Sequence, residues 1–334
     1  MGLIEDDAYQ VTLHEKYVKG SLTNLTPEAL RQAVSPDFPK VLNIEPTSAC
    51  NLKCRWCPRE KSGRADAFFP WELYERVIAE LREQERLIMI NFHKDGEPLL
   101  HDRLVDMVAL AKKWNVSELT HLNTNALRLT PDLSSALVDS GLDDITVSID
   151  ASHPETFAKF KGADALERVE RNVLNLLERR AAKNALNPYV RVKIIKFDGL
   201  RDGEVDDFLA KWTGKADFVQ VAGMHTWSKS VQFHSTSLES RRRYPCPIPW
   251  HSLVVCANGD VTSCTGDWKV ENNYGSLITD TLAGLWRSRK AREHRRRHLE
   301  GGIVPGSVCH DCSFWVPSGD MTDFLTTKRD MYAE

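Results

Sequence analysis

The sequence predicts an α/β fold: a partial, open (β/α)6 barrel followed by a small cysteine-rich C-terminal domain. From residue 41 onward, short apolar runs alternate with amphipathic segments, which is typical of repeated βα units around a parallel sheet. About six such units can be counted, fewer than the eight of a closed barrel. The chain of 334 residues also exceeds the roughly 250 to 300 residues at which a single core stops growing. A second, smaller unit is therefore expected.

The pattern divides the chain into four parts: an N-terminal extension (1–39), the barrel (40–227), a linker (228–245) and the C-terminal domain (246–334). The strands expected in the barrel are 41–45, 87–92, 119–123, 144–149, 189–197 and 217–221. The helices expected between them are 70–84, 102–114, 131–140 and about 163–182. Pro70 suits a helix start and Gly141 a helix end. In the C-terminal domain, Asn258-Gly259 predicts a tight turn between strands at 251–255 and 261–263, before a basic helix near 282–299.

Composition excludes several classes of partner. Hydrophobic residues make up 42% of the chain, charged residues 27%, and the net charge is -3, which is ordinary for a globular protein and gives no sign of a nucleic-acid partner. The N-terminus lacks the pattern of a secretion signal, and no apolar stretch reaches the roughly 18 residues of a membrane span. We therefore expect a cytoplasmic protein with no membrane partner. Its eight cysteines fall into two clusters, a distribution that favours metal ligation over disulfides.

Three cysteines, Cys50, Cys54 and Cys57, follow the first expected strand with the spacing Cys-x3-Cys-x2-Cys. Ligands of parallel α/β folds bind at this end of the strands. Three thiolates can hold three irons of a cubane, and no fourth cysteine lies nearby to complete it. The fourth iron is then open to the amino and carboxylate groups of a small molecule. The alternative is structural zinc, with His93 or His101 as a fourth ligand.

This motif, with the aromatic Trp56 before its third cysteine, resembles the radical S-adenosylmethionine (SAM) superfamily over roughly residues 40–225. The resemblance implies SAM and a [4Fe-4S] cluster as cofactors. It also implies reductive cleavage of SAM to methionine and a 5'-deoxyadenosyl radical, which abstracts a hydrogen from the substrate. A reductant such as flavodoxin or ferredoxin is implied as a partner.

After the second expected strand, Asp95-Gly96-Glu97-Pro98 resembles the family's Gly-Gly-Glu-Pro motif for the SAM amino group, with Asp95 in place of the first glycine. The residues that the resemblance assigns to SAM binding are Trp56, Gly96, Glu97, Pro98, Asn125, Ser148 and Asp150. On its own, Gly-Glu-Pro is an ordinary turn, and the polar residues at strand ends equally suit capping of the next helix.

The remaining cysteines lie between residues 246 and 312. Their arrangement resembles the auxiliary-cluster extensions called SPASM and the shortened form called twitch. The resemblance implies that Cys246, Cys264, Cys309 and Cys312 ligate a second [4Fe-4S] cluster; a four-cysteine zinc site is the alternative. Cys256 is left over. It is either a small buried hydrophobic residue or a catalytic thiol that donates a hydrogen atom to a substrate radical.

The family suggests C–H abstraction from a hydroxylated small molecule, such as a sugar, aminoglycoside or aminocyclitol. The substrate radical is then oxidised to a ketone, which is dehydrogenation, or quenched from the other face by Cys256, which is epimerisation. Modification of a ribosomal peptide is an alternative. However, the roughly 40 residues before the first strand are too few for a separate leader-binding domain. A zinc-stapled binding module without catalysis is a third interpretation.

Polar side chains on the expected strands or at their ends could hold substrate hydroxyls, although each is equally suited to packing or solvent. They are His93, Lys94, His121, Lys193, Lys196, His225 and Trp227. The arginine-rich segment 287–297 is expected to be a solvated helix face or a contact for an anionic nucleotide-sugar.

Overall fold

The computed structural model describes residues 35, 37–197, 199–224, 245–310 and 312. Among them, nine strands form a sheet in the order β6-β5-β4-β3-β2-β1-β7-β8-β9. Strands β1 to β7 run parallel, and β8 and β9 add antiparallel at one end. The strands are β1 (Val41–Ile44), β2 (Leu87–Phe92), β3 (Ser117–Thr124), β4 (Asp144–Ser148), β5 (Tyr189–Lys196), β6 (Phe218–Gly223), β7 (Ser252–Val255), β8 (Asp260–Thr262) and β9 (Gly275–Ser276). The sheet does not close into a barrel, which confirms the expected open α/β architecture.

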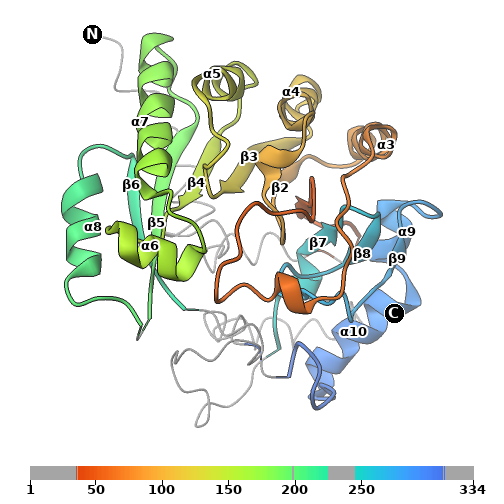
Figure 1. The fold of residues 1–334 in the computed structure, drawn as a ribbon. Helices are drawn as coiled ribbons and strands as arrows, with labels where there is room; N and C mark the ends of the chain where they lie inside the picture. The colour runs from red at the N-terminus through yellow and green to blue at the C-terminus, as the bar shows by residue number, and fades with distance from the viewer. Residues whose placement is uncertain (1–34, 36, 198, 225–244, 311, 313–334) are drawn as a thin grey trace.

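Helices α3, α4, α5 and α7 lie in a row along one face of the sheet, and α9 and α10 lie beyond its β7–β9 end (Figure 1). The helices are α3 (Trp71–Arg82), α4 (Leu104–Trp114), α5 (Pro131–Asp139), α6 (Pro154–Lys161), α7 (Leu166–Ala182), α8 (Glu204–Trp212), α9 (Leu282–Trp286) and α10 (Arg289–Glu300). Short 3-10 turns are η1 (Arg59–Lys61), η2 (Pro98–Leu100) and η3 (Ile248–Trp250). No helix in the described part of the chain is long and apolar enough to cross a membrane.

All six barrel strands lie within a few residues of their predicted positions, but the helices differ in three places. The helix expected near 163–182 is found as α7, but the shorter helix α6 before it was not predicted; Gly162 ends α6 in the left-handed conformation (φ 79°). Helix α8 was not predicted either. The basic helix expected at 282–299 is two helices, and Ser288 caps the second by accepting a hydrogen bond from the Ala291 amide (3.2 Å).

The predicted hairpin at the start of the C-terminal domain is confirmed as β7 and β8, and Val255 pairs with Val261 across its turn. The sequence did not predict that β7 also pairs with β1, in parallel, from Val41 with Ser252 to Ile44 with Val255. The sheet therefore runs without a break from the barrel into the C-terminal domain. Most of the expected linker lies outside the described residues.

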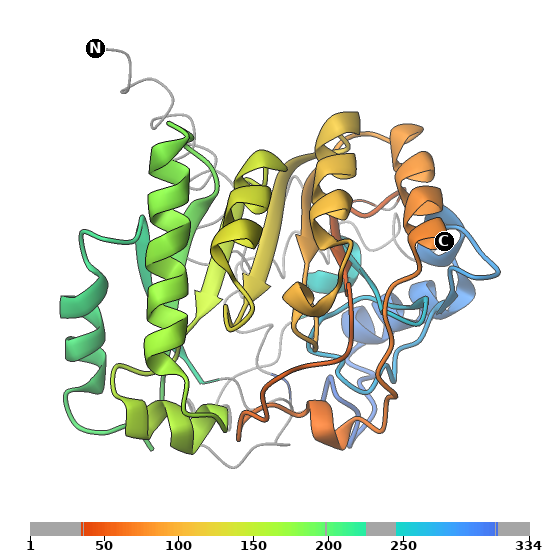
Figure 2. The same ribbon diagram turned by 45° about the horizontal axis from the view of Figure 1, so that its top comes forward.

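The two faces of the sheet differ in chemistry. Successive side chains of a strand point to opposite faces. The face that packs against the helices contributes apolar residues to the main core: Leu42, Ile44, Ile90, Phe92, Leu122, Ile145, Val147, Val190, Val192, Leu253 and Val255. The opposite face, called the inner face here, carries Asn43, Asn91, His121 and Asp144 in register across four strands. Figure 2 shows the row of helices on one side of the strands.

Candidate active site and second cysteine site

Cys50, Cys54 and Cys57 lie on the loop that leaves the carboxyl end of β1. Burial raises the pKa of the Cys50 thiol to about 11 and that of the Cys57 thiol to about 12, and the charge of Cys54 contributes to both increases. Each thiolate makes it harder for its neighbours to lose a proton. A bound metal would supply the positive charge that lets all three thiols ionise. Cys50, Cys54 and Cys57 can therefore hold the first cluster.

The side chain of Trp56 packs against other parts of the protein and holds the cysteine loop in place. Its ring packs in a small cluster with Phe160, Phe197 and Met224, and its centroid lies 5.3 Å from that of Phe197. The amide of Arg55 also donates a hydrogen bond to the Phe160 carbonyl (2.9 Å). Since the Trp56 side chain is only 6% exposed, its contacts with the end of α6 and with Phe197 anchor the cysteine loop.

Gly96 lies directly against the segment that leads into Cys50. A Cβ atom at Gly96 would lie 2.1 Å from the Thr47 carbonyl oxygen and 2.6 Å from that of Ala49, so only glycine fits. The next amide, that of Glu97, donates a hydrogen bond to the Ala49 carbonyl (2.8 Å). The turn that the family resemblance assigns to SAM is thus docked onto the cysteine loop.

The Glu97 carboxylate ties this turn to the end of β3. It accepts hydrogen bonds from the Thr124 hydroxyl (2.5 Å), the Asn125 amide (2.7 Å) and the Leu99 amide (3.1 Å). The last of these bonds caps η2, which Pro98 opens. Asn125 in turn donates from Nδ2 to Asn51 Oδ1 on the cysteine loop (2.8 Å). Glu97 therefore positions the predicted SAM residues relative to one another.

Asp150 and Ser148 are held by a buried lysine from α6. Lys161 Nζ donates to Asp150 Oδ2 and to the Ser148 carbonyl, each at 2.8 Å. Asp150 has a left-handed backbone (φ 60°) and is 1% exposed. Its other oxygen, Oδ1, is buried and has no hydrogen-bond partner in the described part of the chain. Asp150 thus keeps one acceptor for a ligand hydroxyl.

Asp95, which replaces the first glycine of the family motif, takes part in a network of ion pairs through its carboxylate. Its carboxylate pairs with Lys94 and, at 2.7 Å, with Arg64, while its amide donates to Glu45 (3.3 Å). Arg64 also pairs with Glu45, whose carboxylate accepts a hydrogen bond from the Ala257 amide (2.9 Å). Sequence analysis missed Glu45 and Arg64. A charged residue directly after the buried strand Val41–Ile44 was the available signal.

Cys256 follows β7 next to this network. Val255 contributes to the apolar core on the helix side, so the following residue belongs to the inner face. Cys256 is 0% exposed, and burial raises the pKa of its thiol to about 12. After burial, the largest effects on this pKa come from the charge of Lys94, which lowers it, and that of Glu45, which raises it. Cys256 therefore remains a protonated thiol at neutral pH.

The other predicted polar groups are spread over the inner face and its upper end. His121 donates from Nδ1 to Asp144 Oδ1 (2.7 Å), because its Nε2 accepts from the Asn123 amide group (2.7 Å). Burial lowers the pKa of His93 to about 3, so this ring is neutral, and its Nδ1 has no partner in the described residues. Burial also lowers the pKa of Lys193. Lys196 is exposed. His225 and Trp227 lie outside the described residues.

The second cysteine site assembles three distant segments. Burial raises the pKa of Cys264 well above its usual value, and the charges of Cys312, Cys246 and Cys309 raise it further. The same four cysteines were predicted as ligands. Because the charges of the other three act on the Cys264 thiol, the arrangement fits one metal cluster with four thiolates. Cys256 is not among the groups with the largest effects on the Cys264 pKa.

Helix α10 supplies two histidines to this second site that sequence analysis missed. His294 Nε2 lies 3.6 Å from Cys309 Sγ, and His298 Nδ1 accepts a hydrogen bond from the Cys246 amide (3.4 Å). Their spacing of four residues on a helix was the available signal, because it places both on one face. Asn272 Nδ2 also contacts Cys309 Sγ, at 3.7 Å.

Comparison with known proteins agrees with this geometry. The model of the radical SAM superfamily matches residues 44–210, and that of the SPASM iron–sulfur cluster-binding domain matches residues 246–313. A GTP 3',8-cyclase from Heliobacterium modesticaldum is 31% identical over 191 residues, which cover 54% of each chain. A probable GTP 3',8-cyclase from Methanothermobacter thermautotrophicus is 27% identical over 210 residues, covering 62% of this chain and 63% of the relative. The chain spans about half the length of the first of these relatives.

Solved structures with the same fold are more distant in sequence. BtrN in complex with AdoMet and 2-DOIA is 18% identical, with a TM-score of 0.56 over 83% of this chain and 93% of BtrN. SuiB of Streptococcus suis bound to its precursor peptide SuiA is 15% identical, with a TM-score of 0.62 over 84% of this chain and 70% of SuiB. Together with the family matches, the cysteine sites mean that the cofactors are SAM and [4Fe-4S] clusters, including an auxiliary one. The chain belongs to the radical SAM superfamily and carries a SPASM iron–sulfur domain.

Proposed function

We propose that this enzyme abstracts a hydrogen atom from a carbon of a hydroxylated small molecule, such as a sugar, aminoglycoside or aminocyclitol, and completes an epimerisation or a dehydrogenation. The observation that carries the proposal is the polar inner face of the sheet. In a packed barrel this face is filled by branched apolar residues. Here Asn43, Asn91, His121 and Asp144 form a row across it.

Hydrogen-bonding capacity on this face is not used up. Asn91 donates to Asn43 (2.9 Å), yet Asn91 Oδ1 is buried and accepts no hydrogen bond from the described residues. The buried Nδ1 of the neutral His93 is also unpaired among them. Unpaired buried polar atoms cost roughly 1–3 kcal/mol each, so a ligand hydroxyl that pairs with them would be bound preferentially.

In this proposal the two cysteine sets divide the work. Cys50, Cys54 and Cys57 hold the cluster that, together with SAM, supplies the 5'-deoxyadenosyl radical when bound. SAM is placed beside this cluster by Gly96, Glu97, Pro98 and Asn125. Asp150 Oδ1 accepts a hydrogen bond from a ribose hydroxyl of SAM. Cys246, Cys264, Cys309 and Cys312 hold the auxiliary cluster, which supplies a one-electron redox centre when bound.

Cys256 is the proposed hydrogen-atom donor if the reaction is an epimerisation. A donor must keep its proton, and a thiol with a pKa of about 12 does so at neutral pH. A donor must also reach the substrate, and Cys256 belongs to the inner face. The competing role, a small residue that merely fills space, is tested by Cys256→Ala. If that variant still forms deuterated, inverted product in D₂O, the thiol has no catalytic role.

The deciding experiment is incubation of the anaerobically reconstituted enzyme with SAM in D₂O and a panel of aminocyclitols, aminoglycosides, GTP and a short peptide. A coupled rise in 5'-deoxyadenosine identifies the substrate class. Deuterium in the product then indicates a thiol quench, and a loss of two hydrogens indicates oxidation to a carbonyl. GTP belongs in the panel because curated relatives are GTP 3',8-cyclases and because its ribose is hydroxylated. Turnover of the peptide alone would contradict the proposal.

A further inference from the structure

Helix α10 presents two very different faces. Toward the protein it buries His294 and His298, which contact the cysteines of the second site. Toward solvent it carries basic side chains. A helix with its side chains is only about 10 Å across, so whatever binds the outer face lies close to the auxiliary cluster.

The outer face is strongly cationic. The exposed residues Arg287, Arg289, Lys290 and Arg292 have no carboxylate partner in the described part of the chain, whereas the protein as a whole has a net charge of -3. These four residues are called the α10 patch here. The next two cations, Arg296 and Arg297, are neutralised by Glu293 (2.8 and 3.1 Å) and, for Arg296, by Glu300 (2.7 Å).

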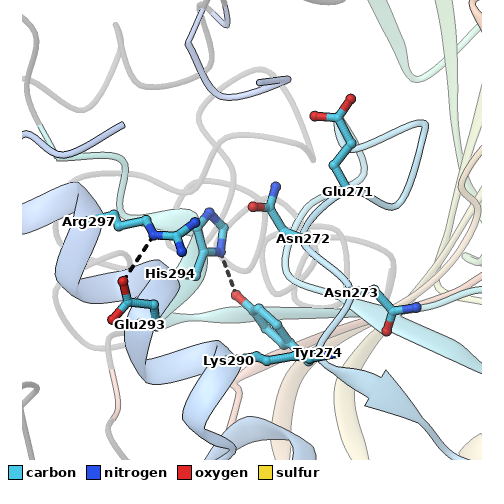
Figure 3. Close-up of a pocket in the computed structure, with 8 residues that line it drawn as sticks. All are labelled: Glu271, Asn272, Asn273, Tyr274, Lys290, Glu293, His294 and Arg297. Atoms are coloured by element: carbon cyan, nitrogen blue, oxygen red, sulfur yellow. Dashed lines mark hydrogen bonds and ion pairs between the residues drawn. The ribbon is translucent and has the colours of Figure 1, made fainter. Parts of the chain in front are cut away.

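A cavity of about 290 Å³ is lined by one residue of the patch, Lys290, by two carboxylates, and by two residues that contact Cys309 of the second cysteine site, His294 and Asn272. Figure 3 shows Lys290 of the patch lining it together with Tyr274 and His294. The Tyr274 hydroxyl lies 2.7 Å from His294 Nδ1, which fixes the ring with its Nε2 toward Cys309. Asn272, on the opposite wall, reaches the same sulfur. The groups that line this cavity thus touch a proposed ligand of the auxiliary cluster.

We propose that the α10 patch is the docking surface for an acidic one-electron carrier of the flavodoxin or ferredoxin type, which exchanges electrons with the auxiliary cluster there. The inference rests on the proposed function for its electron balance. Forming a carbonyl from the substrate radical releases one electron and one proton. The carrier accepts the electron, and solvent takes up the proton. Regenerating the Cys256 thiol from its thiyl radical requires one electron and one proton, which the reduced carrier and solvent supply.

Charge and composition favour this partner over a nucleic acid. The cations form one short cluster rather than a track along a groove. Helix α10 has no Phe, Tyr or Trp on which a base could stack, and its two histidines are buried. Electrostatic complementarity raises association rates by roughly 10- to 1000-fold, and salt screens that effect with a Debye length of about 10 Å at 0.1 M.

The test compares two triple charge reversals of the holoenzyme. The first, Arg289→Glu/Lys290→Glu/Arg292→Glu, reverses the α10 patch. The matched control, Arg168→Glu/Arg171→Glu/Arg179→Glu, makes the same change on α7, at the other end of the sheet (Figure 1). With an acidic bacterial flavodoxin at low ionic strength, we expect binding at least about tenfold weaker for the first variant and within about twofold for the control. High salt should remove most of the difference.

A second readout reports electron exchange without substrate. In a Cys54→Ala background, which lacks the first cluster, flavodoxin hydroquinone should reduce the auxiliary cluster at least about tenfold more slowly when the α10 patch is reversed. Reduction by dithionite, a small ion that needs no docking, should change far less, and this separates lost docking from a damaged cluster.

Equal binding by the α10 and α7 variants would overturn the docking surface. So would stronger binding of a DNA oligonucleotide than of flavodoxin, with loss of the oligonucleotide in the α10 variant. If the four cysteines bind zinc instead, no iron signal appears in the Cys54→Ala background and the proposed cluster assignment fails. Flavodoxin binding, measured separately, would still decide whether the patch is a docking surface.

Discussion

Cys50, Cys54 and Cys57 come from one loop after β1, whereas the four cysteines of the second site come from three segments spread over residues 246–312. The first set is held by neighbours in its own barrel, mainly through Gly96 and Trp56. The second depends on β7 and α10 to bring its parts together. The first site offers three sulfurs, one fewer than the irons of a [4Fe-4S] cluster, while the second offers four. A local, incomplete set of ligands suits catalysis, and a dispersed, complete set suits electron transfer.

The sharpest way to break this comparison is to remove one ligand of the first site. Cys54→Ala should abolish 5'-deoxyadenosine formation, a larger loss than the roughly 10- to 100-fold that follows removal of an outer-shell partner of a metal. The variant should keep about four irons, held by the second site. Iron content and deoxyadenosine yield together check the prediction. Retained cleavage would mean that this cysteine is not a ligand.

The reciprocal change is Cys264→Ala in the second site. We expect SAM cleavage within a few-fold of the parent enzyme, because the first site is built without this residue, while coupled product formation is lost. Iron should fall to about four per chain. If the zinc alternative holds, iron would already be about four in the parent enzyme and one zinc would disappear instead.

Gly96→Ala tests how tightly the SAM turn is docked on the cysteine loop. The new methyl group would meet two backbone carbonyl oxygens at 2.1 and 2.6 Å, so the backbone must move. Overpacking of this kind costs roughly 1–3 kcal/mol or more of unfolding free energy, and SAM affinity should fall with it. The control is Gly223→Ala, where the added Cβ meets no atom within 4 Å and a change within about 0.5 kcal/mol is expected. Chemical denaturation and SAM titration measure both.

Glu97→Gln is a milder change at the same place. An amide group cannot accept hydrogen bonds at both of its ends, so the Asn125 amide or the Thr124 hydroxyl loses its acceptor. The lost hydrogen bond should cost roughly 1–3 kcal/mol of stabilisation. We expect a higher KM for SAM, with the iron content unchanged. Glu155→Gln, on the exposed surface of α6, is the matched control and should be silent. A silent Glu97→Gln would show that the carboxylate does not position the SAM residues.

The smallest expected effect concerns Cys256 and pH. Since burial raises its pKa to about 12, the thiol should stay protonated, and deuterium incorporation from D₂O should not change between pH 7 and 9 on its account. An ordinary cysteine, with a pKa near 8.5, would be largely thiolate at pH 9. Folding favours the protonated form, so this group's contribution to stability is complete below about pH 8.5 and is lost as the pH rises toward 12. Rapid alkylation of Cys256 in the native holoenzyme at pH 8 would contradict the structure.

The sequence allowed the prediction of features that depend on neighbouring residues. Strand β2 was located to the residue from its apolar run, and the β7–β8 hairpin from its Asn-Gly turn. Features that depend on distant contacts escaped. The pairing of β7 with β1 joins residues that are about 210 positions apart, and no periodicity reveals it. The ion pairs of Arg64 likewise arise only when the ends of β1 and β2 lie side by side.

The junction between β1 and β7 makes the two metal-binding units inseparable. Within the intact sheet, β1 is an interior strand with a neighbour on each side. A fragment that ends before residue 246 would turn it into an edge strand whose free backbone amides and carbonyls invite pairing with other molecules. The same cut would take the Ala257 amide from the buried Glu45 carboxylate. Aggregation of an isolated barrel is therefore built into the topology, and the domains have to be studied together.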